Sequence, residues 1–153
     1  FAVTPAQWEQ MLDVNLRSGF LLGQAAGAHM RERAQSGEAP PGRILFIASL
    51  HAHAPRNLPH YSAAKAGQTM LMKELARALG PWGIRVNVVS PGLTSTDTVV
   101  NNIPKELIEE RRSQRAIKRL QTADDLVGTV LFLASDDAAW VTGERLTASG
   151  GYH

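Results

Sequence analysis

The segment 43–49 has the sequence Arg-Ile-Leu-Phe-Ile-Ala-Ser and decides the fold of this chain. Residues 43–48 form a short continuous apolar run that begins directly after the turn-forming residues Pro40, Pro41 and Gly42. Such a run, bounded by turn signals, is typical of a strand that is buried on both faces of a parallel sheet. Ser49 therefore lies at the carboxyl end of a strand, where open α/β sheets bind their ligands.

The flanking segments alternate between helical and strand patterns. A helix is predicted over 59–79 and another from about Thr122 to Ala134, and strands are predicted over 84–89 and 144–149. Strands that alternate with helices imply right-handed parallel crossovers. The sequence therefore predicts an α/β fold with a three-stranded parallel sheet, and we expect residues 1–153 to form a single domain.

The first segment predicts a long helix, from Thr4-Pro5 to about Ser36, with a kink near Asn15. Three glycines, at positions 19, 23 and 27, share one stripe of this helix, and each costs it up to about 1 kcal/mol relative to alanine. We expect a helix or strand, of this chain or of another subunit, to approach the stripe closely. The alternative is that the glycines are tolerated without a partner.

Composition excludes several classes of function. The 153 residues contain no cysteine, which rules out disulfides, thiolate metal sites and cysteine nucleophiles. Sixteen basic residues are scattered among 14 acidic ones, so we expect no nucleic-acid partner. No apolar run reaches the ~18 residues of a membrane span, so we expect no membrane partner and a cytoplasmic location.

The pair Tyr61 and Lys65 is the first candidate for chemistry. Their four-residue spacing places both side chains on one face of the predicted helix. A fixed ammonium close to a phenol favours the phenolate, which helps the phenol to exchange a proton with an alcohol or carbonyl oxygen. The alternative for this pair alone is an exposed helix edge without chemistry.

Taken in order, these motifs resemble the short-chain dehydrogenase/reductase family. The resemblance rests on Ser49, the Tyr61-x-x-x-Lys65 pair, the strand that runs into Pro91-Gly92, and closing motifs such as Val141-Thr142-Gly143. It implies that this chain is the C-terminal part of a Rossmann-type, doubly wound parallel sheet. It also implies an NAD(P)-dependent oxidoreductase that interconverts a secondary alcohol and a ketone as a homo-oligomer, either a dimer or a tetramer.

The resemblance also implies a role for each matching residue. Tyr61 would be the general acid/base, Lys65 would tune it and bind the nicotinamide ribose, and Ser49 would stabilise charge on the reacting oxygen. Asn15 would hold a water in a proton relay from Lys65, unless it is only a helix-kink residue. His51 would contact the substrate together with Ser49 and Tyr61.

The cofactor contacts follow from the same resemblance. Pro91 and Gly92 would line the nicotinamide of NAD or NADP, and Thr94 and Thr96 would meet its carboxamide, although Thr96 could also be a simple helix N-cap. However, no G-x-G-x-x-G turn for a pyrophosphate occurs in the chain. We therefore expect a further N-terminal half in the whole protein, and weak cofactor binding by this chain alone.

Three other interpretations remain open. Ser62-Ala63-Ala64-Lys65 matches the S-x-x-K motif of penicillin-binding proteins, but the partner motifs of that class are missing. His51, His53 and His60 could chelate a metal, but no carboxylate lies in their loop, so we expect no metal site. A silent homologue or fragment that acts as an oligomeric scaffold is the non-enzymatic alternative.

A polar region at 93–102 is followed by a predicted short charged helix that begins at about Pro104. The segment 109–119 is rich in glutamate and arginine, and it follows the region where the family has a mobile substrate lid. A solvated face is the first interpretation of this segment. A lid that recognises an anion is the second.

Overall fold

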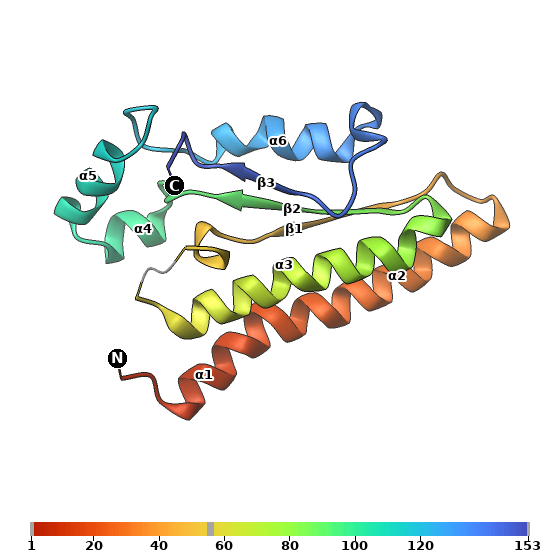
Figure 1. Cartoon of the computed structure of the whole chain (residues 1–153), viewed down its shortest axis with the longest axis horizontal. Helices are drawn as coiled ribbons and strands as arrows, with labels where there is room; N and C mark the ends of the chain where they lie inside the picture. The colour runs from red at the N-terminus through yellow and green to blue at the C-terminus, as the bar shows by residue number, and fades with distance from the viewer. Residues whose placement is uncertain (1, 55–56, 153) are drawn as a thin grey trace.

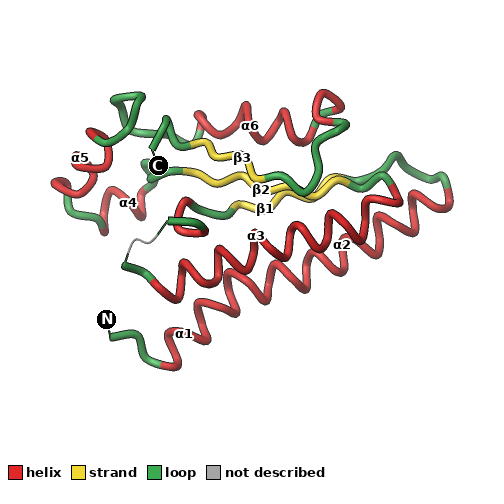
Figure 2. The backbone as a smooth tube through the Cα atoms, viewed as in Figure 1, coloured by secondary structure: helices red, strands yellow, loops and turns green. Residues whose placement is uncertain are grey.

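The computed structural model describes residues 2–54 and 57–152, and it forms three layers (Figure 1). The strands β1 (Arg43–Ile47), β2 (Arg85–Pro91) and β3 (Arg145–Ala148) make a parallel sheet in the order β1-β2-β3. Helices α2 (Ser18–Ser36) and α3 (Pro59–Leu79) cover one face of this sheet, and α1 (Pro5–Leu12) packs against α3 on the same side. Helix α6 (Asp124–Ala134) covers the other face (Figures 1 and 2). The predicted α/β fold with three parallel strands is confirmed.

The strands differ in how deeply they are buried. β2 lies in the centre and is buried along almost its whole length, because both edges are paired and both faces are covered. Within the described residues β1 pairs with β2 alone, and Ile47 at its end is 48% exposed. The expectation that this strand is buried on both faces is only partly correct: Phe46 and Ala48 are buried on one face, whereas Ile47, which points to the opposite face, is half-exposed.

The long N-terminal helix is interrupted where the sequence predicted a kink. It consists of α1 (Pro5–Leu12), a π-helical turn (Asp13–Arg17) and α2 (Ser18–Ser36). Thr4 caps α1 through its side chain, and Gly37 ends α2 in a left-handed conformation, with φ of 74°. A π-helical turn inserts one extra residue into the helical ladder, which is a recognised cause of helix bending.

The glycine stripe of α2 packs against α3 (Pro59–Leu79) and β1 of the same chain. A Cβ added at Gly23 would lie 2.8 Å from a methyl carbon of Leu75, and one added at Gly27 would lie 2.8 Å from a methyl carbon of Leu79. The close approach that we expected is therefore made within the chain. The stripe itself gives no indication of a subunit boundary.

The second face of the sheet is covered by α6 (Asp124–Ala134). Its buried Leu133 joins Val89 of β2 and Ala138 in a second hydrophobic core, separate from the core beneath α3. Arg85 of β2 also reaches the end of this helix and donates hydrogen bonds to three carbonyl oxygens there. The sheet is thus held by an apolar core on each face and by one buried guanidinium.

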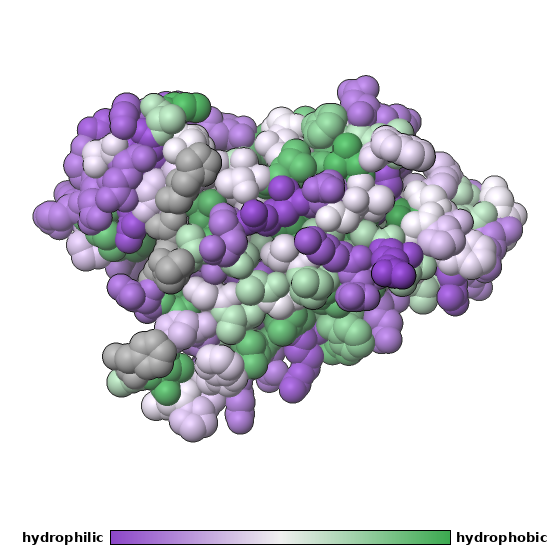
Figure 3. Space-filling model, viewed as in Figure 1, coloured by the Kyte–Doolittle hydropathy of each residue, from purple (hydrophilic) through white to green (hydrophobic). Residues whose placement is uncertain are grey.

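Two short helices, α4 (Asp97–Asn102) and α5 (Lys105–Ser113), lie beyond the carboxyl end of β2. The sequence predicted α5, but it left the segment of α4 as an irregular polar region because that segment has no apolar periodicity. Hydrophilic residues gather over α5 on the surface (Figure 3). None of the described helices has the length and apolar character that crossing a membrane requires.

Candidate active site

A pocket of about 420 Å³ lies at the carboxyl ends of β1 and β2. It is bounded by the 3-10 turn Leu50–Ala52 after β1, the first turn of α3, and the helices α4 and α5. The tertiary structure brings together seven of the residues that the sequence singled out, although they come from three separate segments. These residues are Ser49, His51, Tyr61, Pro91, Gly92, Thr94 and Thr96.

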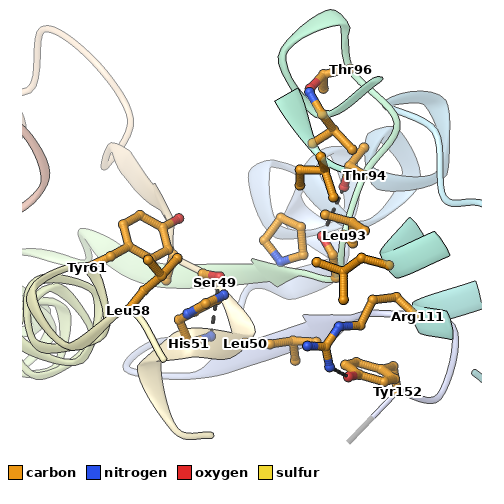
Figure 4. Close-up of a pocket in the computed structure, with 16 residues that line it drawn as sticks. Ser49, Leu50, His51, Leu58, Tyr61, Leu93, Thr94, Thr96, Arg111 and Tyr152 are labelled. Atoms are coloured by element: carbon orange, nitrogen blue, oxygen red, sulfur yellow. Dashed lines mark hydrogen bonds between the residues drawn. The ribbon is translucent and has the colours of Figure 1, made fainter. Parts of the chain in front are cut away.

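Ser49, His51 and Tyr61 form one wall of the pocket (left side of Figure 4). The Ser49 hydroxyl oxygen accepts the backbone N–H of His51 at 3.3 Å, which fixes its position and leaves its own hydrogen free to be donated. The imidazole of His51 meets the edge of the Tyr61 ring, with 5.1 Å between centroids and 76° between planes. The wall therefore presents two hydroxyl groups, at Ser49 and Tyr61, to the same space.

Lys65 lies one helical turn beyond Tyr61 and is 9% exposed. Its ammonium donates to the carbonyl oxygen of Ile47 at 2.8 Å and to Oε1 of Gln68 at 3.4 Å, and it lies 5.7 Å from the centroid of the Tyr61 ring. Burial lowers the pKa of Lys65 because it penalises the charged form. Lys65 is therefore a positioned cation behind the wall and does not itself line the pocket.

Asn15 lies in the π-helical turn and does not line the pocket. Its side-chain amide donates to the carbonyl oxygen of Met11 at 3.2 Å, while Lys65 bonds to Ile47 and Gln68. The structure thus shows Asn15 in the kink and shows no direct bond between it and Lys65. Its role in a proton relay stays a prediction.

The segment after β2 forms a second wall (right side of Figure 4). A Cβ added at Gly92 would lie 3.2 Å from Cα of Ser149, so the absence of a side chain lets two backbone segments approach. Thr94 donates its hydroxyl to the carbonyl oxygen of Gly92 at 3.2 Å, and Thr96 accepts the N–H of Val99 at 3.3 Å. Thr96 is therefore the N-cap of α4 and also a residue of the pocket.

Sequence reasoning missed the part of the pocket that α4, α5 and the C-terminal segment supply. Arg111 of α5 and Tyr152 line it, together with apolar side chains at positions 99, 103 and 107. The only signal was the unusual charge of segment 109–119. The interpretation of that segment as a solvated face is wrong at Arg115, which is 2% exposed and donates to the carbonyl oxygens of Leu93 and Arg119.

The residues of the competing interpretations lie apart from one another. The hydroxyl of Ser62 lies 3.5 Å from Nδ1 of His51, whereas the Lys65 ammonium turns toward Ile47, so the S-x-x-K pair is not joined. His51 lies against Tyr61, and His53 contacts Arg145. Residues 2–54 and 57–152 contain no group of three or more His, Cys, Asp or Glu side chains that could hold a metal ion.

Comparisons with known proteins extend over the whole chain. The sequence model of a family described as enoyl-(acyl carrier protein) reductase matches residues 1–153. The chain is 38% identical over 151 residues to "Probable galactose dehydrogenase GalD" of Rhizobium meliloti. This match covers 98% of the present chain and 57% of that protein. The chain is 35% identical over 153 residues to the acetoacetyl-CoA reductase of the same species, covering 99% of this chain and 61% of that protein.

A solved structure shows the same arrangement of elements. It is a 7α-hydroxysteroid dehydrogenase complexed with NADH and 7-oxo glycochenodeoxycholic acid, with a TM-score of 0.90 and 32% identity. The match covers 99% of this chain and 58% of that chain. The present chain thus spans less than two thirds of the length of these similar proteins.

Proposed function

Because the chain belongs to the short-chain dehydrogenase/reductase family, we propose that it is the catalytic part of an NAD(P)-dependent oxidoreductase. The reaction that we propose is the interconversion of a secondary alcohol and a ketone. One observation carries the proposal: the hydroxyl groups of Ser49 and Tyr61 share a pocket with Pro91-Gly92 at the carboxyl edge of the sheet. Lys65 lies directly behind the tyrosine, 5.7 Å from its ring centroid.

In this proposal the protein moves a proton at the substrate oxygen. Tyr61 donates the proton when a ketone is reduced and removes it when an alcohol is oxidised. Ser49 donates a hydrogen bond to the same oxygen, because the N–H of His51 occupies one lone pair of its hydroxyl oxygen and holds that oxygen in place, while the hydroxyl hydrogen is left for the substrate. The nearby Lys65 ammonium stabilises negative charge on the phenol oxygen during this exchange.

The pocket fits the nicotinamide end of the cofactor. The second wall offers the segment Pro91-Gly92 and the polar residues Thr94 and Thr96. The nicotinamide, when bound, supplies the hydride acceptor or donor. The chain has no glycine-rich turn for the pyrophosphate, so the remainder of the dinucleotide is held by residues outside these 153 in the whole protein.

The proposal is tested on the full-length protein by following NADH and NADPH absorbance with a panel of ketones and secondary alcohols. We expect Tyr61→Phe to lower kcat/KM by about 10²- to 10⁴-fold, because general acid–base catalysis is lost while the ring remains. Thr98→Val is the matched control. Thr98 is exposed on α4 and does not line the pocket, so we expect this variant to keep the activity of the unsubstituted protein.

The outcomes separate the enzyme from the silent alternative. Loss of turnover confined to Tyr61→Phe, with an unchanged melting temperature, would support the proposed role. No turnover by the unsubstituted full-length protein, with either cofactor on any member of the panel, would overturn the proposal in favour of a silent scaffold.

A further inference from the structure

Arg111 is the one Arg, Lys, Asp or Glu among the described residues that line the candidate pocket. It projects from α5 beside Tyr152, on the side of the pocket that faces away from Tyr61 in Figure 4. None of the described residues that line the pocket is Asp, Glu or Lys. A ligand in this space therefore meets a guanidinium and no carboxylate side chain from residues 2–54 and 57–152.

The guanidinium of Arg111 is held in place but is not neutralised. It donates a hydrogen bond to the hydroxyl of Tyr152, and its Cζ lies 5.8 Å from the centroid of that ring. Tyr152 is 7% exposed, so this support is buried. The ion pairs found within the described part of the chain do not include Arg111, whereas its neighbour Arg112 pairs with Glu109.

The walls next to Arg111 strengthen its attraction for an anion. The side chains of Val99, Ile103 and Leu107 line the same pocket and are apolar. Apolar walls limit the access of water, and a charge attracts its partner more strongly where water is excluded. A guanidinium has five N–H donors in a planar fork, and the bond to Tyr152 leaves most of them available.

We propose that Arg111 binds an oxyanion group, a carboxylate or a phosphate, carried by the substrate at a distance from its reacting carbon. This inference rests on the proposed function, because it assigns the substrate class of the same pocket. The planar fork of arginine matches the oxygen pairs of carboxylate and phosphate, so Arg111 selects acidic ketones and alcohols over neutral ones. It also orients them with the reacting oxygen toward Ser49 and Tyr61.

The test measures binding of matched charged and neutral probes to the full-length protein by calorimetry. The carboxylate pair is 4-oxopentanoate and its methyl ester, and the phosphate pair is dihydroxyacetone phosphate and dihydroxyacetone. We expect the unsubstituted protein to bind at least one charged probe about 10- to 100-fold more tightly than its neutral counterpart. Arg111→Gln removes that preference, and Arg111→Lys, which keeps the charge but loses the fork, retains part of it.

The matched control is Arg112→Gln, because Arg112 is the adjacent arginine, does not line the pocket, and pairs with Glu109. It keeps the full preference. Equal binding of charged and neutral probes in both pairs, or a preference that survives Arg111→Gln, would overturn the assignment. So would a loss confined to NADH binding in Arg111→Gln, since that would assign the guanidinium to the cofactor. Turnover is measured separately: its absence overturns the proposed function, while the binding preference still decides the role of Arg111.

Discussion

Replacing Arg85 with methionine should loosen α6 from the sheet. Arg85 is the first residue of β2 and is 8% exposed. Its guanidinium donates to the carbonyl oxygens of Leu133 at 2.9 Å, Ala138 at 2.8 Å and Ser135 at 2.7 Å. Leu133 lies in the last turn of α6 and Ser135 is its C-cap, where the helix dipole also favours a cation. Ala138 ends the 3-10 turn that follows, and its carbonyl oxygen also accepts the N–H of Val141. One side chain therefore satisfies two carbonyl groups that the helix end leaves without an intrahelical partner, and it joins the next turn to them.

The expected cost follows from these three bonds. A hydrogen bond to a charged group contributes about 1.5–3 kcal/mol, so the plain sum would be about 4.5–9 kcal/mol. That sum is too large, because bonds made by one side chain are not additive and because burial lowers the pKa of Arg85 by penalising its charge. Arg85→Met removes the charge and leaves neutral carbonyl groups, and each buried acceptor left without a donor costs about 1–3 kcal/mol. Because Ala138 keeps the N–H of Val141, two carbonyl groups lose their donor, and we expect Arg85→Met to lower the free energy of unfolding by about 2–6 kcal/mol.

The assay is urea unfolding of the full-length protein, followed by circular dichroism at 222 nm. Arg77→Met is the matched control: Arg77 is exposed on α3, and we expect a change within about 0.5 kcal/mol. Arg85→Lys can reach fewer of the three acceptors and should fall between the two. A loss below about 1 kcal/mol for Arg85→Met would refute the reasoning, because the three bonds would then contribute no more than water does.

Three further perturbations follow from the packing and the charges. Gly27→Val should lower the free energy of unfolding in urea by about 1–3 kcal/mol, because its Cβ would lie 2.8 Å from a methyl carbon of Leu79; an unchanged midpoint would contradict the close packing. Burial lowers the pKa of Lys65 below its ordinary value of 10.5, so between these two pH values the folded chain binds fewer protons at Lys65 than the unfolded chain does. The free energy of unfolding should therefore rise with pH in that window. Lys65→Met should remove this rise. The Arg119 guanidinium holds the pKa of Asp125 well below its usual range. The stability difference between the unsubstituted protein and Asp125→Asn should therefore be complete above about pH 5 and disappear as pH falls through the lowered pKa. A difference that persists in strong acid would contradict the pairing.

The order of the elements could be predicted because most helices and strands show a local pattern of apolar residues and turn signals. The apolar run at 43–48 predicted β1, and the boundaries of α3 at Pro59 and Leu79 agree with the predicted range 59–79. The kink near Asn15 appears as the π-helical turn Asp13–Arg17. The six residues of α4 could not be predicted, because they are too few to show a helical period and Thr96 is the only start signal.

The site was predicted only in part, because only some of its residues carry a local signal. Tyr61 and Lys65 are four residues apart on one helix, and Ser49 ends a strand, so their proximity follows from secondary structure. Arg111 and Tyr152 are 41 residues apart, and no local pattern joins them. Their contact depends on how α5 and the C-terminal segment fold over the carboxyl edge of the sheet.

By itself, the sequence determined the class of fold and the chemistry offered by Ser49, Tyr61 and Lys65. The spacing of apolar residues over a short stretch determines which face of a helix or strand is apolar. The hydrophobic effect then buries that face. The tertiary structure alone decided which charges are buried and which reach the pocket. Arg111 lines the pocket and Arg115 is 2% exposed in the interior, although both belong to one charged segment. Burial is a property of the packed whole, because it depends on what distant segments bring to the same place.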